Sequence, residues 1–145
     1  MSRLAVIATA LLLLGPAGPT TAQERDPEAP VGGWLDRFFG YAAYKMGNYD
    51  DARAIWLPLA EAGDPRAQEY VGMLYEHGQG VEADPETALL WYRTAAESGD
   101  VTAQYNLGVA LVEGRLADAD AEEGRHWLEQ AAARGDQDAA RRLAR

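Results

Sequence analysis

The sequence contains no cysteine, and only two of its 145 residues are histidine. Without cysteine the chain has no disulfide, no thiolate ligand for a metal cluster, no thiol nucleophile and no site for a lipid anchored on a cysteine. His77 and His126 are far apart in the sequence and belong to different parts of the repeat pattern described below, so they are not expected to meet at a metal ion. The sequence therefore predicts neither a metal site nor a cofactor.

Basic residues are also scarce. Thirteen Lys and Arg stand against 23 Asp and Glu, which gives a net charge of −10 at neutral pH. A field of this sign repels phosphate backbones, so nucleic acid and anionic membrane surfaces are not expected as partners. A protein partner with a basic surface is favoured. The alternative that the acidity only keeps the chain soluble remains open.

Long apolar runs are missing except near the first residue. Arg3 precedes an apolar run from Leu4 to Leu14, and small residues follow it up to Gln23, a pattern typical of a secretory signal peptide over residues 1–22. The run is too short to cross a bilayer, which takes about 20 residues of helix. We expect cleavage near Ala22, a mature chain that is not inserted in a membrane, and a periplasmic or secreted location. An uncleaved leader that stays as an anchor is the alternative.

Residues 23–33 mix charge, proline and glycine without periodicity, which predicts a flexible leader. From Trp34 onward, apolar residues recur at helical spacing and no alternating Val/Ile-rich run occurs. The sequence therefore predicts a single all-α domain over residues 34–145.

The apolar pattern repeats every 36 residues. Each copy places a large residue and small alanines at i, i+3, i+4, i+7 and i+8, which lines one face of a helix. The three copies are Ala52, Ile55, Trp56, Leu59 and Ala60; Ala88, Trp91, Tyr92, Ala95 and Ala96; and Gly124, Trp127, Leu128, Ala131 and Ala132. We call the helices that carry these faces B helices and expect the faces to be core.

A second, weaker series lies between the B helices and predicts partner helices, called A helices. It runs through Ala67, Tyr70, Val71, Leu74 and Tyr75 and returns as Ala103, Leu107 and Leu111. A glycine follows each B helix, where it can adopt the left-handed conformation that ends a helix. The aspartate that comes next can cap the following A helix. These glycine–aspartate pairs are Gly63 and Asp64, Gly99 and Asp100, and Gly135 and Asp136.

The glycine–aspartate pairs divide the domain into unit 1 (34–64), unit 2 (65–100), unit 3 (101–136) and a final capping helix (137–145). Gly40 and Ala52 are 12 residues apart, whereas Gly72 and Ala88 are 16 apart, so unit 1 has a shorter connection between its two helices. A single helix pair cannot bury its apolar face, but stacked pairs share a continuous core.

Residues 67–100 resemble a Sel1-like repeat, and residues 103–136 resemble a second, degraded copy. Unit 1 is similar to a tetratricopeptide repeat through Gly40, Gly47, Tyr49, Ala52 and Trp56. The resemblance implies a right-handed α-solenoid of antiparallel helix pairs that binds other proteins on its concave, A-helix face. Leu116 and Ala117 replace a glycine and a valine of the family pattern, so the last loop is expected to differ in path.

The tetratricopeptide pattern, aligned through Gly40, Gly72 and Gly108, implies which side chains face the groove. Unit 1 contributes Trp34, Arg37, Tyr41, Tyr44 and Lys45; unit 2 contributes Arg66, Glu69, Met73, Glu76 and His77; unit 3 contributes Thr102, Tyr105, Val109, Val112 and Glu113. The groove would be aromatic at one end and acidic further along, and exposed aromatics beside charge are typical of binding hot spots. Tyr41 and Tyr44 could instead pack against the leader.

Catalytic residues are not predicted, because no serine or threonine lies in register with a histidine that could activate it. We predict a non-catalytic protein-binding scaffold of the bacterial cell envelope. A narrower alternative is a periplasmic regulator of a sensor kinase or of polysaccharide export, as in similar repeat proteins. Two others are an envelope hydrolase that uses groove carboxylates and a structural assembly of stacked copies, although a monomer is favoured.

Overall fold

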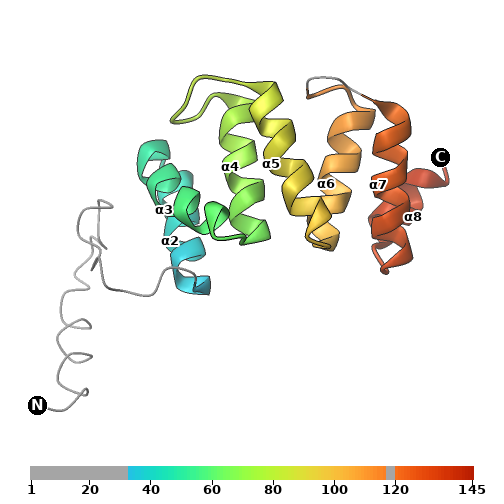
Figure 1. Ribbon diagram of the computed structural model, residues 1–145, viewed down its shortest axis with the longest axis horizontal. Helices are drawn as coiled ribbons and strands as arrows, with labels where there is room; N and C mark the ends of the chain where they lie inside the picture. Colours follow the sequence, from blue (N-terminus) through green and yellow to red (C-terminus); the bar gives the residue numbers. More distant parts are fainter. Residues whose placement is uncertain (1–32, 117–119) are drawn as a thin grey trace, which may run out of the picture.

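The computed structural model describes residues 33–116 and 120–145, which form helices and short connections without a β-strand. The helices are α2 (Trp34–Lys45), α3 (Tyr49–Glu61), α4 (Pro65–His77), α5 (Pro85–Glu97), α6 (Val101–Val112), α7 (Ala121–Ala133) and α8 (Gln137–Leu143), drawn in order in Figure 1. The predicted signal peptide and the leader up to residue 32 lie outside the described residues, as do residues 117–119 of the last loop. The all-α prediction is confirmed.

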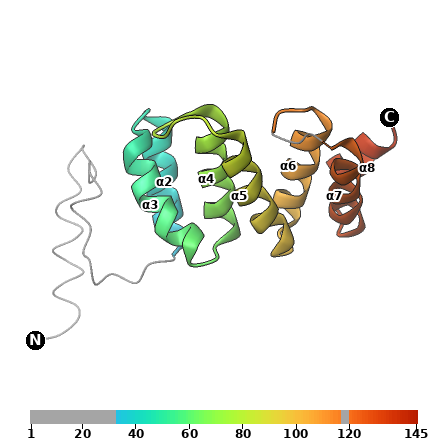
Figure 2. The same cartoon turned by 45° about the horizontal axis from the view of Figure 1, so that its top comes forward.

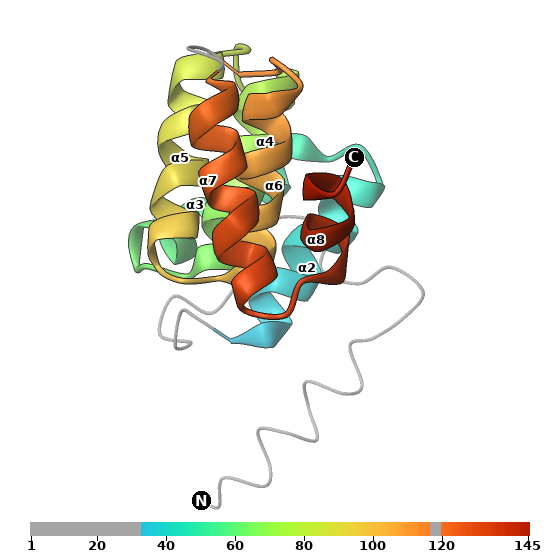
Figure 3. The same cartoon turned by 90° about the vertical axis from the view of Figure 1, so that its right-hand side faces the viewer.

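The helices stack as a row of hairpins, seen from two angles in Figures 1 and 2. Each helix packs mainly against the helices directly before and after it in the chain. In the end-on view of Figure 3, α5 and α7 form one layer and α4 and α6 the other. The helices α4 and α6 approach each other more closely than α5 and α7 do, so the A helices lie on the inner side of the curve. The predicted solenoid of helix pairs is therefore present.

The B-helix faces form the core, as their spacing predicts. Trp56 and Leu59 are fully buried, and Tyr92 and Leu128 are 8% and 3% exposed. The predicted residues that are buried are Ala52, Ile55, Trp56, Leu59, Ala60, Ala88, Tyr92, Ala95, Ala96, Gly124, Leu128 and Ala131. Apart from Gly124, these residues belong to three apolar clusters along the row, and the partly buried Met73 and Tyr75 pack against both the first and the second of them.

Two tryptophans expected in this core, Trp91 and Trp127, are only half-buried. Trp91 packs against the apolar cluster of α3 and α4, and Trp127 packs against the cluster of α5 and α6. Each ring therefore covers the junction with the preceding hairpin and remains partly exposed. Both tryptophans occupy the i+3 position of the repeated pattern, equivalent to Ile55, whereas Trp56 occupies the i+4 position, equivalent to Tyr92 and Leu128.

The turns from B to A helices are built in the same way each time. The glycines Gly63, Gly99 and Gly135 have φ angles of +93°, +89° and +97°. The aspartates that follow them accept hydrogen bonds from the backbone N–H groups of Ala67, Ala103 and Ala139. The left-handed glycine ends one helix and the carboxylate caps the next, so the repeated glycine–aspartate pair fixes the hairpin order.

Two glutamines tie consecutive hairpins together. Gln68 of α4 donates through Nε2 to the carbonyl oxygen of Ala60 at 3.1 Å, and Gln104 of α6 donates to Ala96 at 3.2 Å. Both side chains are buried, and both bonds satisfy a carbonyl near the end of the preceding B helix. Since the two bonds are 36 residues apart at both ends, they account for the repeated glutamine in the A helices.

Candidate binding groove

The inner side of the stack carries a groove between α4 and α6. Its volume is about 250 Å³, and both helices and the segment after α6 contribute to its walls. The groove is lined by Arg66, Glu69, Tyr70, Met73, Glu76, His77, Tyr92, Asn106, Ala110 and Arg115. All five residues predicted from unit 2 are in this set, so the structure brings them together in one groove.

One end of the groove is held by a polar network around Glu69. Its carboxylate accepts a hydrogen bond from Nδ2 of Asn106 at 2.7 Å and one from Arg66 at 3.2 Å. Arg66 also donates to the hydroxyl of Thr102 at 2.9 Å. Burial raises the pKa of Glu69 above its ordinary value, against the hydrogen bond from Asn106 and the charge of Arg66, which lower it. The network joins two repeats across the groove.

The other end is organised around Glu76. Its carboxylate accepts a hydrogen bond from the hydroxyl of Tyr92 at 2.7 Å and one from Arg115 at 2.6 Å. Burial, together with the neighbouring carboxylate, raises the pKa of Tyr92 far above its usual range, so the hydroxyl stays protonated and keeps donating. His77, next to Glu76, is exposed and bonds through Nδ1 to the carbonyl oxygen of Met73.

The unit 1 end of the inner face is aromatic. Tyr41 is 45% exposed and its ring centroid lies 6.2 Å from that of Tyr70, which continues into the groove. Tyr44 lies deeper, with its ring 5.8 Å from that of Trp56. Trp34 is 71% exposed. Of the two tyrosines predicted here, Tyr41 offers surface to a partner, whereas Tyr44 mainly packs against the core.

Two further predicted residues of unit 1 lie at the edge of this face. Arg37 is half-buried and forms an ion pair with Asp64, the cap of α4, so its guanidinium connects the first hairpin to the second. Lys45 is exposed in the last turn of α2.

Unit 3 differs most from the expected groove. Val109 is 8% exposed and belongs to a cluster with Leu128 and Ala139, and Tyr105 packs against the same cluster. These two side chains point toward α7 and α8 because the capping helix adds its own apolar residues on that side. Val112 is 43% exposed. Glu113 is exposed and pairs with both Arg115 and Arg142.

The sequence-based prediction includes only half of the residues that line the groove. Tyr92 is assigned to the core by its spacing, yet its hydroxyl reaches Glu76. Tyr70 and Asn106 are equivalent positions in successive repeats, two residues before Gly72 and Gly108, and that register could have identified them. Arg115 follows Gly114, whose φ is +70°, in a connection that helical periodicity does not describe.

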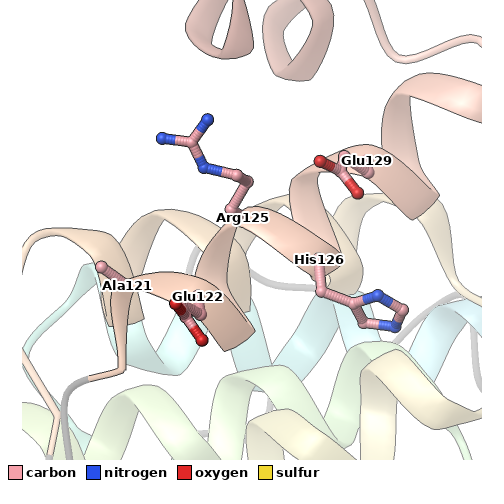
Figure 4. A pocket seen from close by; sticks show the side chains of 5 residues that line it. All are labelled: Ala121, Glu122, Arg125, His126 and Glu129. Carbon is pink, nitrogen blue, oxygen red and sulfur yellow. The ribbon is translucent and has the colours of Figure 1, made fainter.

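A second hollow lies on the outer face and is formed by one helix. Figure 4 shows its side chains diverging from α7, and they are Ala121, Glu122, Arg125, His126 and Glu129. No second element faces them in this set, so the hollow offers no opposing wall to hold a ligand. The groove between α4 and α6 is the better candidate because two repeats enclose it.

Other kinds of site receive no support within residues 33–116 and 120–145. In this part of the chain, no three histidine or acidic side chains are grouped closely enough to hold a metal ion. Among the helices described there, none combines the length and apolar character required to cross a bilayer.

Comparison with solved structures gives close relatives. A Sel1 repeat protein from Oxalobacter formigenes has a TM-score of 0.63 and 32% identity, over 75% of this chain and 85% of that one. A protective antigen of uropathogenic Escherichia coli strains with an SLR fold has a TM-score of 0.64 and 30% identity over 74% of this chain, which spans only 24% of that protein. A comparison with curated proteins found no match.

A family model for the Sel1 repeat matches residues 65–100 and 101–136. These ranges contain α4 to α7, the helices that build the groove. Proteins of this repeat type are typically non-enzymatic scaffolds for protein–protein interactions. The chain belongs to the Sel1 repeat family.

Proposed function

We propose that this protein is a non-catalytic scaffold of the bacterial cell envelope that captures a segment of another protein on its A-helix face. The observation that carries the proposal is the groove between α4 and α6, whose walls come from two repeats joined by side-chain hydrogen bonds. Walls that are fixed before binding lose little conformational entropy when a partner arrives. Tyr41 and Trp34 extend the same face with exposed aromatic surface.

The envelope location is proposed from the first 22 residues. If they are a cleaved signal peptide, the protein expressed in its own or a related bacterium is expected in the periplasmic fraction, with Gln23 as its first residue. N-terminal sequencing of the purified protein measures this directly. Recovery of the protein in the cytoplasmic fraction with Met1 or Ser2 at its start would contradict the proposed location and leave the binding proposal intact.

A partner on the A-helix face can be located by site-specific crosslinking. We expect a photoreactive side chain at Tyr41 or His77 to crosslink one envelope protein, and the same group at exposed Arg125 on the outer side of α7 to give none. Alanine at Tyr41 should reduce capture at least fivefold without changing the circular dichroism spectrum, because its ring is 45% exposed. Equal crosslinking from Arg125 would show that the inner face is not the binding surface.

The hydrolase alternative requires a carboxylate that reaches substrate together with a second acidic group at a suitable distance. Glu69 is only 5% exposed, and its two oxygens accept hydrogen bonds from Arg66 and Asn106. Both oxygens of Glu76 are likewise bonded, to Tyr92 and Arg115. These contacts favour binding over hydrolysis. Saturable turnover of a cell-wall substrate by the purified protein would reverse this preference.

A further inference from the structure

The acidic and basic side chains of the groove lie at two different depths below the surface. The carboxylates lie underneath, since the side chains of Glu69 and Glu76 are 6% and 8% exposed. Their arginine partners lie above them, with the side chains of Arg66 and Arg115 each 42% exposed. A molecule that enters the groove therefore meets guanidinium groups first, although the chain as a whole carries a net charge of −10.

Both guanidinium groups keep donors for a ligand. An arginine has five N–H donors. Within the described residues, Arg66 uses Nη1 toward Glu69 and Nη2 toward Thr102, and its Nε lies 4.0 Å from Oδ2 of Asp100. Arg115 uses Nη1 toward Glu76 and Nε toward Glu113. The internal bonds hold each planar group in place, and the remaining N–H groups can bind a carboxylate with the geometry that arginine favours.

The two arginines stand at opposite ends of the groove. Arg66 is in the first turn of α4, whereas Arg115 bonds to Glu76 in the last turn of the same helix. Ten residues separate positions 66 and 76, which corresponds to about 15 Å at the rise of an α-helix. Met73 of α4 and Ala110 of α6 provide apolar surface between the ends. An extended peptide covers about 15 Å with four to five residues.

We propose that the groove binds an extended acidic peptide segment, with two carboxylates about four residues apart and an apolar side chain between them. This inference rests on the proposed scaffold function and specifies its ligand. One carboxylate would bind Arg66, the other Arg115, and the apolar side chain would contact Met73. A basic surface elsewhere on the partner remains compatible, since the rest of the chain is strongly acidic.

A basic peptide fits this groove poorly. Its cations would face the exposed guanidinium groups. The carboxylates of Glu69, Glu76, Asp100 and Glu113 all lie within 4.0 Å of Arg66 or Arg115 and are already paired with them. The acidic composition predicts a basic partner from net charge, whereas in the groove the arginine side chains are much more exposed than the carboxylates of Glu69 and Glu76 beneath them. Net charge describes the field far from the surface, whereas recognition depends on the groups within a few ångströms of the ligand.

The first test compares three synthetic peptides that differ only at two positions. A fluorescein-labelled seven-residue peptide with glutamate at positions two and six and leucine at position four is titrated with the protein, and fluorescence anisotropy is recorded. We expect the version with glutamine at both positions to bind at least tenfold more weakly, and the version with lysine to show no saturation. Equal binding of the glutamate and glutamine peptides, or no binding of the glutamate peptide, would overturn the proposal.

The second test removes the arginines without leaving a buried carboxylate unpaired. The double variants Arg66→Gln with Glu69→Gln, and Arg115→Gln with Glu76→Gln, change the net charge by zero and replace each ion pair with two amides. Each double variant is expected to bind the glutamate peptide at least fivefold more weakly than the unchanged protein does. The matched control is Arg125→Gln with Glu129→Gln, the same exchange on the exposed outer side of α7 shown in Figure 4.

Folding is checked separately, by circular dichroism and thermal melting of all three double variants. The single variants Arg66→Lys and Arg115→Lys keep the charge and lose only the planar fork, so they are expected to fold and to bind a few-fold more weakly. If the groove variants fold and still bind the glutamate peptide as the control does, the ligand assignment is wrong. Crosslinking from Tyr41 and His77 would then still support the scaffold function, whereas its absence would contradict that function as well.

Discussion

Alanine at Gly108 is expected to lower the stability of the domain by about 2–3 kcal/mol, although alanine normally favours a helix over glycine by about 1 kcal/mol. A Cβ atom at this position would lie 2.8 Å from the carbonyl oxygen of Gly124 and 2.8 Å from Cγ of Leu128. The contact is reciprocal, since a Cβ at Gly124 would lie 2.8 Å from the carbonyl oxygen of Gly108. Backbone atoms cannot turn aside, so α6 and α7 would have to separate. Chemical denaturation measures the loss.

The matched comparison is alanine at Gly72, the equivalent position one repeat earlier. There the nearest atoms are Cδ1 and Cε1 of the Tyr92 ring at 3.0 Å, and the nearest backbone atom, the carbonyl oxygen of Ala88, is at 3.3 Å. A ring can shift by a few tenths of an ångström, so the loss should be about 1 kcal/mol or less. A stability gain in the Gly108 variant would show that α6 and α7 do not approach as closely as the structure has them.

Replacing Trp56 with alanine is expected to lower the free energy of unfolding by about 3–5 kcal/mol, the range for removing a fully buried large aromatic side chain. The indole is completely inaccessible and stacks on Tyr70 with ring centroids 4.5 Å apart. It also covers Gly40 of α2, where a Cβ would meet the indole at 2.1 Å, so the ring fills the space between α2, α3 and α4. Since a small domain is stabilised by only about 5–15 kcal/mol, the first hairpin should unfold early. Hydrogen exchange of α2 and α3 measures this.

Trp34 serves as the control, because it is the same residue type in α2 at 71% exposure. Its replacement with alanine should change stability by no more than about 0.5 kcal/mol. A loss of similar size for both tryptophans would mean that burial does not distinguish them. The pair also separates folding from binding, since Trp34 belongs to the proposed partner face and Trp56 does not.

The sequence predicts the B-helix faces and the turns well, because both depend on local rules. The spacing of Ala52, Trp56 and Leu59 follows the helical period, and the glycine–aspartate pairs follow the chemistry of helix ends. All of these residues lie where the pattern places them. The resemblance to the repeat family adds the order of the hairpins, which periodicity alone does not give.

The groove is less predictable, because its shape depends on contacts between repeats. Val109 occupies a position that faces the groove in the family pattern, but the short capping helix supplies Ala139 as a packing partner and buries it. Arg115 is a loop residue, so no period indicates that its guanidinium reaches back to Glu76, 39 positions earlier. The same holds for the greater exposure of Arg66 and Arg115 relative to Glu69 and Glu76.

Each helix packs mainly on the helices before and after it in the chain, and this limits how far the effect of a substitution spreads. The walls α4 and α6 are not at either extremity of the row, because α2 and α3 stand before them and α7 and α8 after them. These flanking helices protect the ends of the apolar core. A substitution in them affects the groove between α4 and α6 only through the one or two helices in between. Substitutions in the outer hairpins should therefore disturb the shape of the groove less than substitutions in α4 or α6.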